Sequence, residues 1–513
     1  GGFQPQGGAA DPGPPQARTG PCFQIDRIIV TGVTRLPPGL VETLIAPYAP
    51  NCMQGADIQS VMRAIDGTYA DRGYITSKTY IPGQNLADGT LTLEVVEGTV
   101  EGIFIADEAG EIVGRRGERL LGTAFPRVEG EILDLRRFEQ GLDQMNRLPS
   151  VDATLRLQPG DTPGGSYVIV DRIQKDRFRG LVRFDTLASR STGRNRLTFD
   201  LAADDILGAN DTWAASLAGT ANTNALTFAG SIPYGANTFE LGLSYSEYLS
   251  ILSPVSELFG TSSTVDLALR RMLRRGQLST TEGKVSFGYR DGARLVNDTA
   301  LTPQRLASLN LSLRHIQLGE TARNSYDIAI EVGLAAFGAT EDPVDPARDQ
   351  PRAQYQRLLL GWQRQGALGT LGTLVTDVQG QVSPDTLFGS EQMALGSYST
   401  VRGYAEPITS GENGAYLRSD LYLAPDVWTR LLPKAARSAA ARRIQPHVFL
   451  DMGTVRDRVG GDWGSAAGAG FGLSAQTERF TASGIVGVPL IDSRGKLRSS
   501  TPVVQIRLDF KAF

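Results

Sequence analysis

The 513-residue chain has only two histidines and two cysteines, so it is poor in the side chains that bind transition metals and exchange protons near neutral pH. His315 and His447 each lie in a strand-like alternating run, where we expect wall or rim positions rather than a general base. No Walker-type phosphate loop, nucleophile elbow or dinucleotide-binding glycine motif occurs. The sequence therefore predicts no enzyme activity, no bound metal and no cofactor.

An excess of one charge and a long apolar run are also lacking. The chain has 51 Lys and Arg against 55 Asp and Glu, a net charge of −4, which gives no electrostatic reason to bind nucleic acid. No run of apolar residues approaches the length of a transmembrane helix. A transmembrane β-barrel stays possible, because its strands alternate apolar and polar residues and keep the average hydropathy near neutral.

The two cysteines, Cys22 and Cys52, are close enough in sequence to form one disulfide, with two free thiols as the alternative. A disulfide would imply an oxidising compartment such as the bacterial periplasm, and in the chain-entropy model it would contribute roughly 3–4 kcal/mol. Residues 1–21 consist largely of Gly, Pro, Gln and Ala, which predicts a disordered linker. The chain starts without a charged and then apolar leader, so we expect either a removed signal peptide or a protein that is not exported.

Residues 22–98 carry strand and helix patterns in the order strand, helix, helix, strand, strand, and residues 99–175 repeat that order. Units of this size are typical of small two-layer α+β domains. In the first unit we expect strands at 23–31, 74–81 and 90–96 and helices at 40–45 and 57–69. In the second we expect strands at 100–105, 153–157 and 166–170 and helices at 112–121 and 135–145.

After about residue 178 the helical signals stop and alternating segments follow, divided by turn residues. Near the end, Val504, Ile506, Leu508 and Phe510 alternate with four polar residues, Gln505, Arg507, Asp509 and Lys511. A wall with lipid on one side and water on the other accommodates both sets. About 21 residues per strand and connection predict roughly 16 strands for residues 176–513, a size that leaves an aqueous channel. A pair of soluble β-sandwiches is the alternative.

Two short segments are candidates for a functional site. The first is Val401-Arg402-Gly403-Tyr404, and the second is Phe449-Leu450-Asp451-Met452-Gly453. Side chains alternate along a strand, so Asp451 lies on the face opposite Leu450 and Met452. If Leu450 and Met452 contact lipid, Asp451 points into the lumen and can accept a bidentate pair of hydrogen bonds from Arg402. The alternative is a surface hairpin and an unrelated strand aspartate.

These two segments resemble the signature of outer-membrane barrels that move or insert proteins, a superfamily that includes BamA and the two-partner secretion transporters. Residues 134–149, and Gly73-Tyr74 followed by 81–84, resemble the POTRA domains of the two-partner secretion transporters (the TpsB family, of haemolysin secretion/activation type). The resemblance implies two α+β POTRA domains, at 22–98 and 99–175, followed by an all-β transmembrane barrel of about 16 antiparallel strands at 176–513.

The resemblance also implies roles for the site. A loop would fold back into the pore, with Arg402 as its anchor, Gly403 allowing close approach and Tyr404 packing against the wall. Asp451 would accept from Arg402, with Phe449 and Gly453 on the same lumen face.

The function implied is ATP-independent export of a large exoprotein, an adhesin or haemolysin, from the periplasm to the cell surface. The POTRA domains would bind the unfolded client by strand addition at a sheet edge, formed by the last or the second strand of each unit. The expected location is the bacterial outer membrane, with the POTRA domains in the periplasm. The expected partners are the secreted client, outer-membrane lipid and the barrel-assembly machinery during biogenesis, without nucleic acid. The alternatives are a BamA-like assembly factor and a general diffusion pore.

Overall fold

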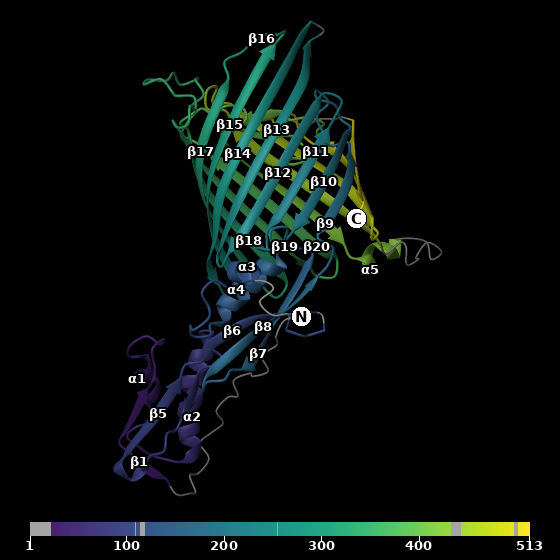
Figure 1. Ribbon diagram of the computed structural model, residues 1–513. Helices are drawn as coiled ribbons and strands as arrows, with labels where there is room; N and C mark the ends of the chain where they lie inside the picture. Colours follow the sequence, from purple (N-terminus) through teal and green to yellow (C-terminus); the bar gives the residue numbers. More distant parts are fainter. Residues whose placement is uncertain (1–21, 108, 113–117, 254, 432–442, 497–500) are drawn as a thin grey trace. The chain divides into compact units, whose positions relative to one another are not determined.

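The computed structural model describes residues 22–107, 109–112, 118–253, 255–431, 443–496 and 501–513 (Figure 1). Residues 1–21 lie outside these ranges, so the linker remains a prediction. The chain divides into two compact units, one formed by residues 1–116, 127–139 and 154–171, and the other by 117–126, 140–153 and 172–513. The second predicted repeat, residues 99–175, therefore contributes to both units.

The first repeat is a three-stranded sheet with a helical layer. Its sheet has the order β2-β5-β4, with β2 parallel and β4 antiparallel to the central strand. The long helix α2 buries Ile58, Val61, Ile65 and Tyr69, spaced three or four residues apart, in the core of this repeat because that spacing places them on one helix face. The elements are β1 (Phe23–Ile25), β2 (Arg27–Thr31), α1 (Leu40–Ile45), β3 (Asn51–Met53), α2 (Gly55–Asp71), β4 (Lys78–Tyr80), the 3₁₀ turn η1 (Leu86–Asp88) and β5 (Thr90–Val96).

Two strands of this repeat differ from prediction. The strand expected at 23–31 is split, because the amides of Asp26 and Arg27 both donate to the carbonyl of Gly89, at 2.7 and 3.2 Å. The strand expected at 74–81 is only β4, because the amide of Ser77 donates to the Tyr74 carbonyl at 3.2 Å and makes a turn before the strand.

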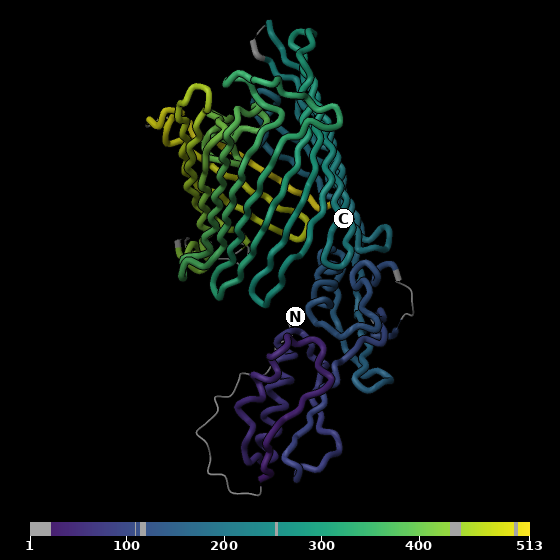
Figure 2. The backbone as a smooth tube through the Cα atoms, turned by 90° about the vertical axis from the view of Figure 1, so that its left-hand side faces the viewer, coloured from purple at the N-terminus to yellow at the C-terminus, as the bar shows by residue number. Residues whose placement is uncertain are grey.

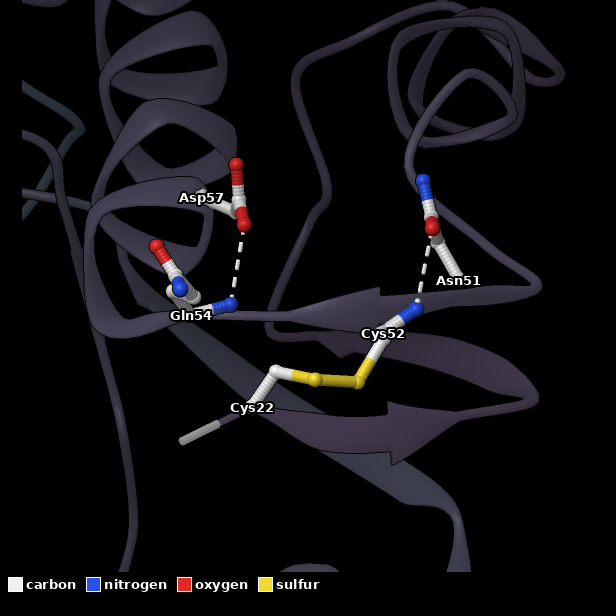
Figure 3. The surroundings of a disulfide bond; sticks show 5 residues. All are labelled: Cys22, Asn51, Cys52, Gln54 and Asp57. Carbon is white, nitrogen blue, oxygen red and sulfur yellow. Dashed lines mark hydrogen bonds between the residues drawn. A yellow bond between two sulfur atoms is a disulfide. The ribbon is translucent and has the colours of Figure 1, made fainter. Parts of the chain in front are cut away.

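The disulfide between Cys22 and Cys52 is present and joins β3 to the residue before β1 (Figure 3). The two Cα atoms are 5.4 Å apart. β1 pairs antiparallel with β3, a short strand that the sequence pattern did not predict. Beside the bridge, the backbone amide of Gln54 donates to the Asp57 carboxylate at 2.8 Å and caps α2. The N-terminal strand of the repeat is thus fixed covalently.

The second repeat has the predicted order of elements and a sheet of order β6-β8-β7, with β6 parallel to β8. The helix expected at 112–121 begins later, because Ile112 pairs with Ala106 in a β-bridge; residues 113–117 lie outside the described ranges. Of the two alternatives for the edge strand, the second strand of each repeat is the one observed: β4 and β7 are edges, whereas the last strand is central in both sheets. The elements are β6 (Thr99–Ala106), α3 (Glu118–Ala124), α4 (Leu135–Asn146), β7 (Val151–Pro159) and β8 (Gly165–Gln174).

The described part of residues 178–511 closes into an antiparallel barrel of 16 strands, with the two-residue β16 as an extra pairing on β15. β27 pairs with β9 and completes the wall. Figure 2, turned by 90°, shows the yellow C-terminal strands crossing behind the teal and green strands of the opposite wall. The barrel strands are β9 (Phe178–Asp185), β10 (Arg196–Asp204), β11 (Thr212–Gly219), β12 (Thr223–Tyr234), β13 (Asn237–Ser253), β14 (Ser256–Arg275), β15 (Ser279–Val296), β16 (Thr299–Ala300), β17 (Gln304–Leu318), β18 (Ala322–Leu334), β19 (Gln356–Leu368), β20 (Gly372–Val382), β23 (Asn413–Leu423), β24 (Ile444–Arg456), β25 (Trp463–Gln476), β26 (Phe480–Pro489) and β27 (Val503–Lys511).

The two faces of the barrel wall have the predicted chemistry. On β27, Val504 and Ile506 are 50% and 43% exposed on the outside, whereas Gln505 between them is buried. Inside, Asp509 pairs with Arg183 at 2.9 Å across the β27–β9 junction. The alternation predicted from the sequence is confirmed: apolar side chains face outward and paired polar side chains face the lumen.

Helices are few in this part of the chain. A short helix, α5 (Pro425–Trp428), and the 3₁₀ turn η2 (Thr429–Leu431) follow β23, although the sequence predicted no helix after residue 178. Proline at the first helical position favours this start. Among the helices in the described ranges, none has the length and apolar character to cross a membrane.

Candidate functional site

The connection between β20 and β23, residues 383–412, is the inner loop. It contains a small hairpin in which β21 (Met393–Leu395) pairs with β22 (Thr409–Gly411). Strand direction alternates from β9 onward, so this loop starts from the barrel end opposite the N-terminus of β9. Its tip lies against the barrel wall, because a Cβ added at Gly468 on β25 or Gly487 on β26 would contact the backbone of Arg402 or Gly403. The glycines of the wall make room for the loop.

Arg402 at the tip is only 3% exposed and binds two carboxylates. Its backbone amide and Nε donate to Asp451 Oδ2 at 3.0 and 2.7 Å, and its Nη2 donates to Oδ1 at 2.8 Å. Its Nη1 and Nη2 donate to the two oxygens of Asp420 at 2.7 and 3.0 Å. The planar guanidinium is suited to this because it can present two pairs of N–H groups at once.

The surroundings strengthen this ion pairing. The guanidinium carbon lies 4.0 Å from the centroid of the Phe449 ring, a distance at which the ring face attracts the cation. Asp451 is fully buried and Phe449 is 4% exposed. Removal of one partner from such a desolvated group of charges typically costs about 3–5 kcal/mol, because the remaining charge stays buried.

The two residues after Arg402 fix the direction of the tip. Gly403 has φ 101°, a conformation that side chains with a Cβ rarely adopt, and its added Cβ would lie 2.7 Å from the carbonyl oxygen of Val488. The Tyr404 hydroxyl is 2.6 Å from the Ile491 carbonyl oxygen and accepts from the Ala467 amide at 3.1 Å. Tyr404 therefore joins the tip to β25 and to the chain after β26.

The structure brings Val401, Arg402, Gly403 and Tyr404 together with Phe449 and Asp451. Gly453 lies elsewhere on the same strand face, where an added Cβ would be 3.0 Å from Leu395 of β21. Cys22 and Cys52 belong to the first unit and are no part of this site.

Asp420 was missed by the sequence reasoning. Its signal was present in β23, where Tyr416, Arg418, Asp420 and Tyr422 alternate with smaller or apolar side chains and so share the lumen face. Within the described ranges, no group of three or more His, Cys, Asp or Glu side chains is arranged to hold a metal ion. The site is thus a docking arrangement of buried charges.

Three family models match the chain. The model described as "Haemolysin secretion/activation protein ShlB/FhaC/HecB" covers residues 164–475. A ShlB-type POTRA domain model covers residues 23–98, and a second POTRA domain model covers residues 99–159.

Characterised relatives are similar over most of their length. The outer membrane transporter CdiB of Dickeya dadantii is 35% identical over 79% of this chain and 73% of its own. An outer membrane transporter CdiB of Escherichia coli is 30% identical over 92% and 80% of the two chains. The hemolysin transporter protein ShlB of Serratia marcescens is 28% identical over 89% and 80%.

Solved structures share the architecture. CdiB from Escherichia coli superposes with a TM-score of 0.86 at 27% identity, over 98% of this chain and 93% of that one. BamA from Haemophilus ducreyi, lacking its POTRA domains 1–3, has a TM-score of 0.54 at 13% identity, over 96% and 100%, a likeness of fold alone.

Proposed function

Because the chain belongs to the haemolysin secretion/activation protein ShlB/FhaC/HecB family, we propose that it exports one large exoprotein, an adhesin or haemolysin, from the periplasm to the cell surface. The barrel stands in the bacterial outer membrane and the POTRA domains are periplasmic. In this proposal residues 22–98 and 99–175 are the two POTRA domains and residues 176–513 are the barrel. The chain transports its client and catalyses no reaction.

The observation that carries the proposal is the inner loop, whose tip is docked on the lumen face by Arg402. A loop held by a few buried ion pairs can be displaced, whereas the hydrogen-bonded wall around it cannot open without breaking many backbone bonds. Folding of the client outside the cell would draw it forward without ATP. The partners are then the unfolded client, the outer-membrane lipid that the apolar wall contacts, and the assembly machinery that inserts the barrel. Nucleic acid is not among the proposed partners.

A deletion strain tests the function by comparing proteins in the medium and in the outer membrane. We expect loss of one exoprotein from the cell surface and medium, with other outer-membrane barrels unchanged, and restoration by the wild-type gene but not by Arg402→Ala. Loss of many barrels would instead indicate a BamA-like assembly factor. Unchanged protein profiles with altered uptake of small solutes would indicate a diffusion pore.

We further propose that the client binds the POTRA domains by strand addition. The edge strand β4 supports this, since Tyr80 is 53% exposed and the adjacent Ile81 is 49% exposed, and an apolar edge is a ready template for another strand. A photoreactive residue at Tyr80 should crosslink to the client during export, whereas one at the buried Leu93 of the central strand should not. Equal labelling at both positions, or at neither, would count against strand addition.

A further inference from the structure

A second group of charges fastens the inner loop to the barrel, at a place separate from the Arg402 tip. Glu391 lies in the part of the inner loop before β21, residues 383–392, which we call the limb. It accepts from Arg290 Nη1 of β15 at 2.7 Å and pairs with Arg357 Nη2 of β19 at 2.8 Å. The Glu391 backbone carbonyl also accepts from Arg357 Nη1 at 2.8 Å and from Gln381 Nε2 at 3.0 Å. We call Arg290, Glu331, Arg357 and Glu391 the shoulder cluster, and Arg402, Asp420 and Asp451 the tip cluster.

The two clusters share no residue and use different parts of the wall. The shoulder cluster engages β15, β18 and β19, whereas the tip cluster engages β23 and β24. The side chains of Glu391 and Arg357 are 8% and 13% exposed, so this pair is also largely removed from water. Removal of one partner from such a pair typically costs more than the at most about 1 kcal/mol of an exposed surface pair, because the remaining charge stays buried.

The clusters differ in what remains when the loop leaves. At the shoulder, Arg357 lies directly opposite Glu331 in the β18–β19 register and bonds it at 3.0 Å, and the Tyr355 hydroxyl donates to the same carboxylate. The wall therefore keeps a satisfied ion pair after Glu391 departs. At the tip, departure of Arg402 leaves Asp420 and Asp451 without their shared cation in a buried site, which is far more costly.

We propose that Glu391 is a positioning residue that latches the first limb of the inner loop to the wall, and that this latch opens before the Arg402 tip undocks. The loop then leaves in two steps, with the limb at residues 383–392 released first. The physical reason is the asymmetry of the charges left behind. At the shoulder, Arg357 keeps its pair with Glu331, and Arg290, whose side chain is 40% exposed, is left to water. At the tip, two buried carboxylates lose their shared cation.

Cysteine labelling of the purified full-length protein tests the order of release. Both native cysteines are in the disulfide, so an introduced thiol is the only one to react with a maleimide. Leu387 on the limb and Val401 at the tip are 1% and 0% exposed and serve as matched buried probes. We expect Leu387→Cys to react faster than Val401→Cys. We further expect Glu391→Gln to accelerate labelling of Leu387→Cys on the order of tenfold, the effect of losing a charged hydrogen bond. Val401→Cys should remain the slower probe in this background, because release of the tip follows release of the limb.

Controls make the result specific. Glu341→Gln removes an exposed carboxylate from the connection between β18 and β19 and should leave both rates unchanged. Arg357→Gln combined with Glu391→Gln should accelerate Leu387→Cys by less than the product of the two single effects, since both substitutions remove the Arg357–Glu391 ion pair. If Leu387→Cys fails to assemble, Thr386→Cys, 5% exposed on the same limb, replaces it. The proposal is overturned if Val401→Cys reacts as fast as Leu387→Cys, or if Glu391→Gln leaves the labelling rate of Leu387→Cys unchanged. No client is required, so the result is independent of the proposed export function.

Discussion

At the tip of the inner loop, one guanidinium binds two carboxylates and lies over an aromatic ring. A lysine at position 402 would keep the charge but would lose the fork that reaches Asp420 and Asp451 together. The sequence pointed to Arg402 and Asp451 through a motif and the alternation along one strand. It did not point to Asp420, because alternation assigns a face but not the register of neighbouring strands. That register puts Asp420 opposite Phe449.

The backbone at Gly403 allows a test of docking that leaves every charge in place. Gly403→Ala should reduce export on the order of tenfold, because a positive φ costs about 1–3 kcal/mol for a residue with a Cβ and the new methyl would contact the Val488 carbonyl. The measurement is the amount of exoprotein released by cells carrying each variant. Gly389→Ala is the matched control, since nothing lies within 4 Å of its added Cβ. Equal export by both variants would contradict the need for close docking.

Among the elements, the periodic ones were predicted best. α2, α4 and β5 were placed within a few residues of their observed bounds, because a long amphipathic pattern specifies its own face. β3 was missed, since three residues carry too little pattern, and its pairing with β1 depends on contacts distant in sequence. Glu391 of the shoulder cluster lies in a loop without periodicity, so only the folded structure shows that it meets Arg290 and Arg357.

In the first repeat, Glu97 ties the segment before α1 to α2. Its carboxylate accepts from the amides of Thr34 and Arg35 at 2.7 and 2.9 Å and from the Tyr69 hydroxyl at 2.7 Å. Burial acts to raise the pKa of Glu97, but the hydrogen bonds from Thr34, Tyr69 and Arg35 outweigh burial and hold the pKa below its ordinary value of 4.5. The ionised form therefore stabilises this repeat.

The lowered pKa of Glu97 predicts how the stability of the first repeat depends on pH. The stabilisation by Glu97 is fully present above the unfolded-state pKa, near 4.5, and is lost as the pH falls through the lower folded-state pKa. Thermal unfolding of the full chain, followed by the helical circular dichroism signal, should show an early transition that moves to lower temperature on acidification. Glu97→Gln should weaken this dependence, and Glu94→Gln, at an exposed position of β5, should not. A dependence on pH that is unchanged in Glu97→Gln would rule out this carboxylate as its source.

At the scale of the whole molecule, the barrel separates apolar side chains from charged ones. The barrel has apolar residues on its outer face and paired charges on its inner face, and the alternation in β27 predicted that division before any contact was known. The approximate strand number also followed from length, because each strand and its connection occupy a similar stretch of chain. The path of the inner loop did not follow, since it depends on which glycines of β25 and β26 leave space for it.

The central claim is that the client passes through the barrel, and crosslinking to a client arrested in transit tests it most directly. Ser312 lines the interior between β15 and β18, and the neighbouring Leu311 is 51% exposed on the outside. The probe is the exoprotein lost from the deletion strain, arrested by a folded domain fused to its C-terminus. A photoreactive residue at position 312 should crosslink to this protein and one at position 311 should not. Crosslinks from position 311 alone, or from neither position with the client arrested, would contradict passage through the lumen.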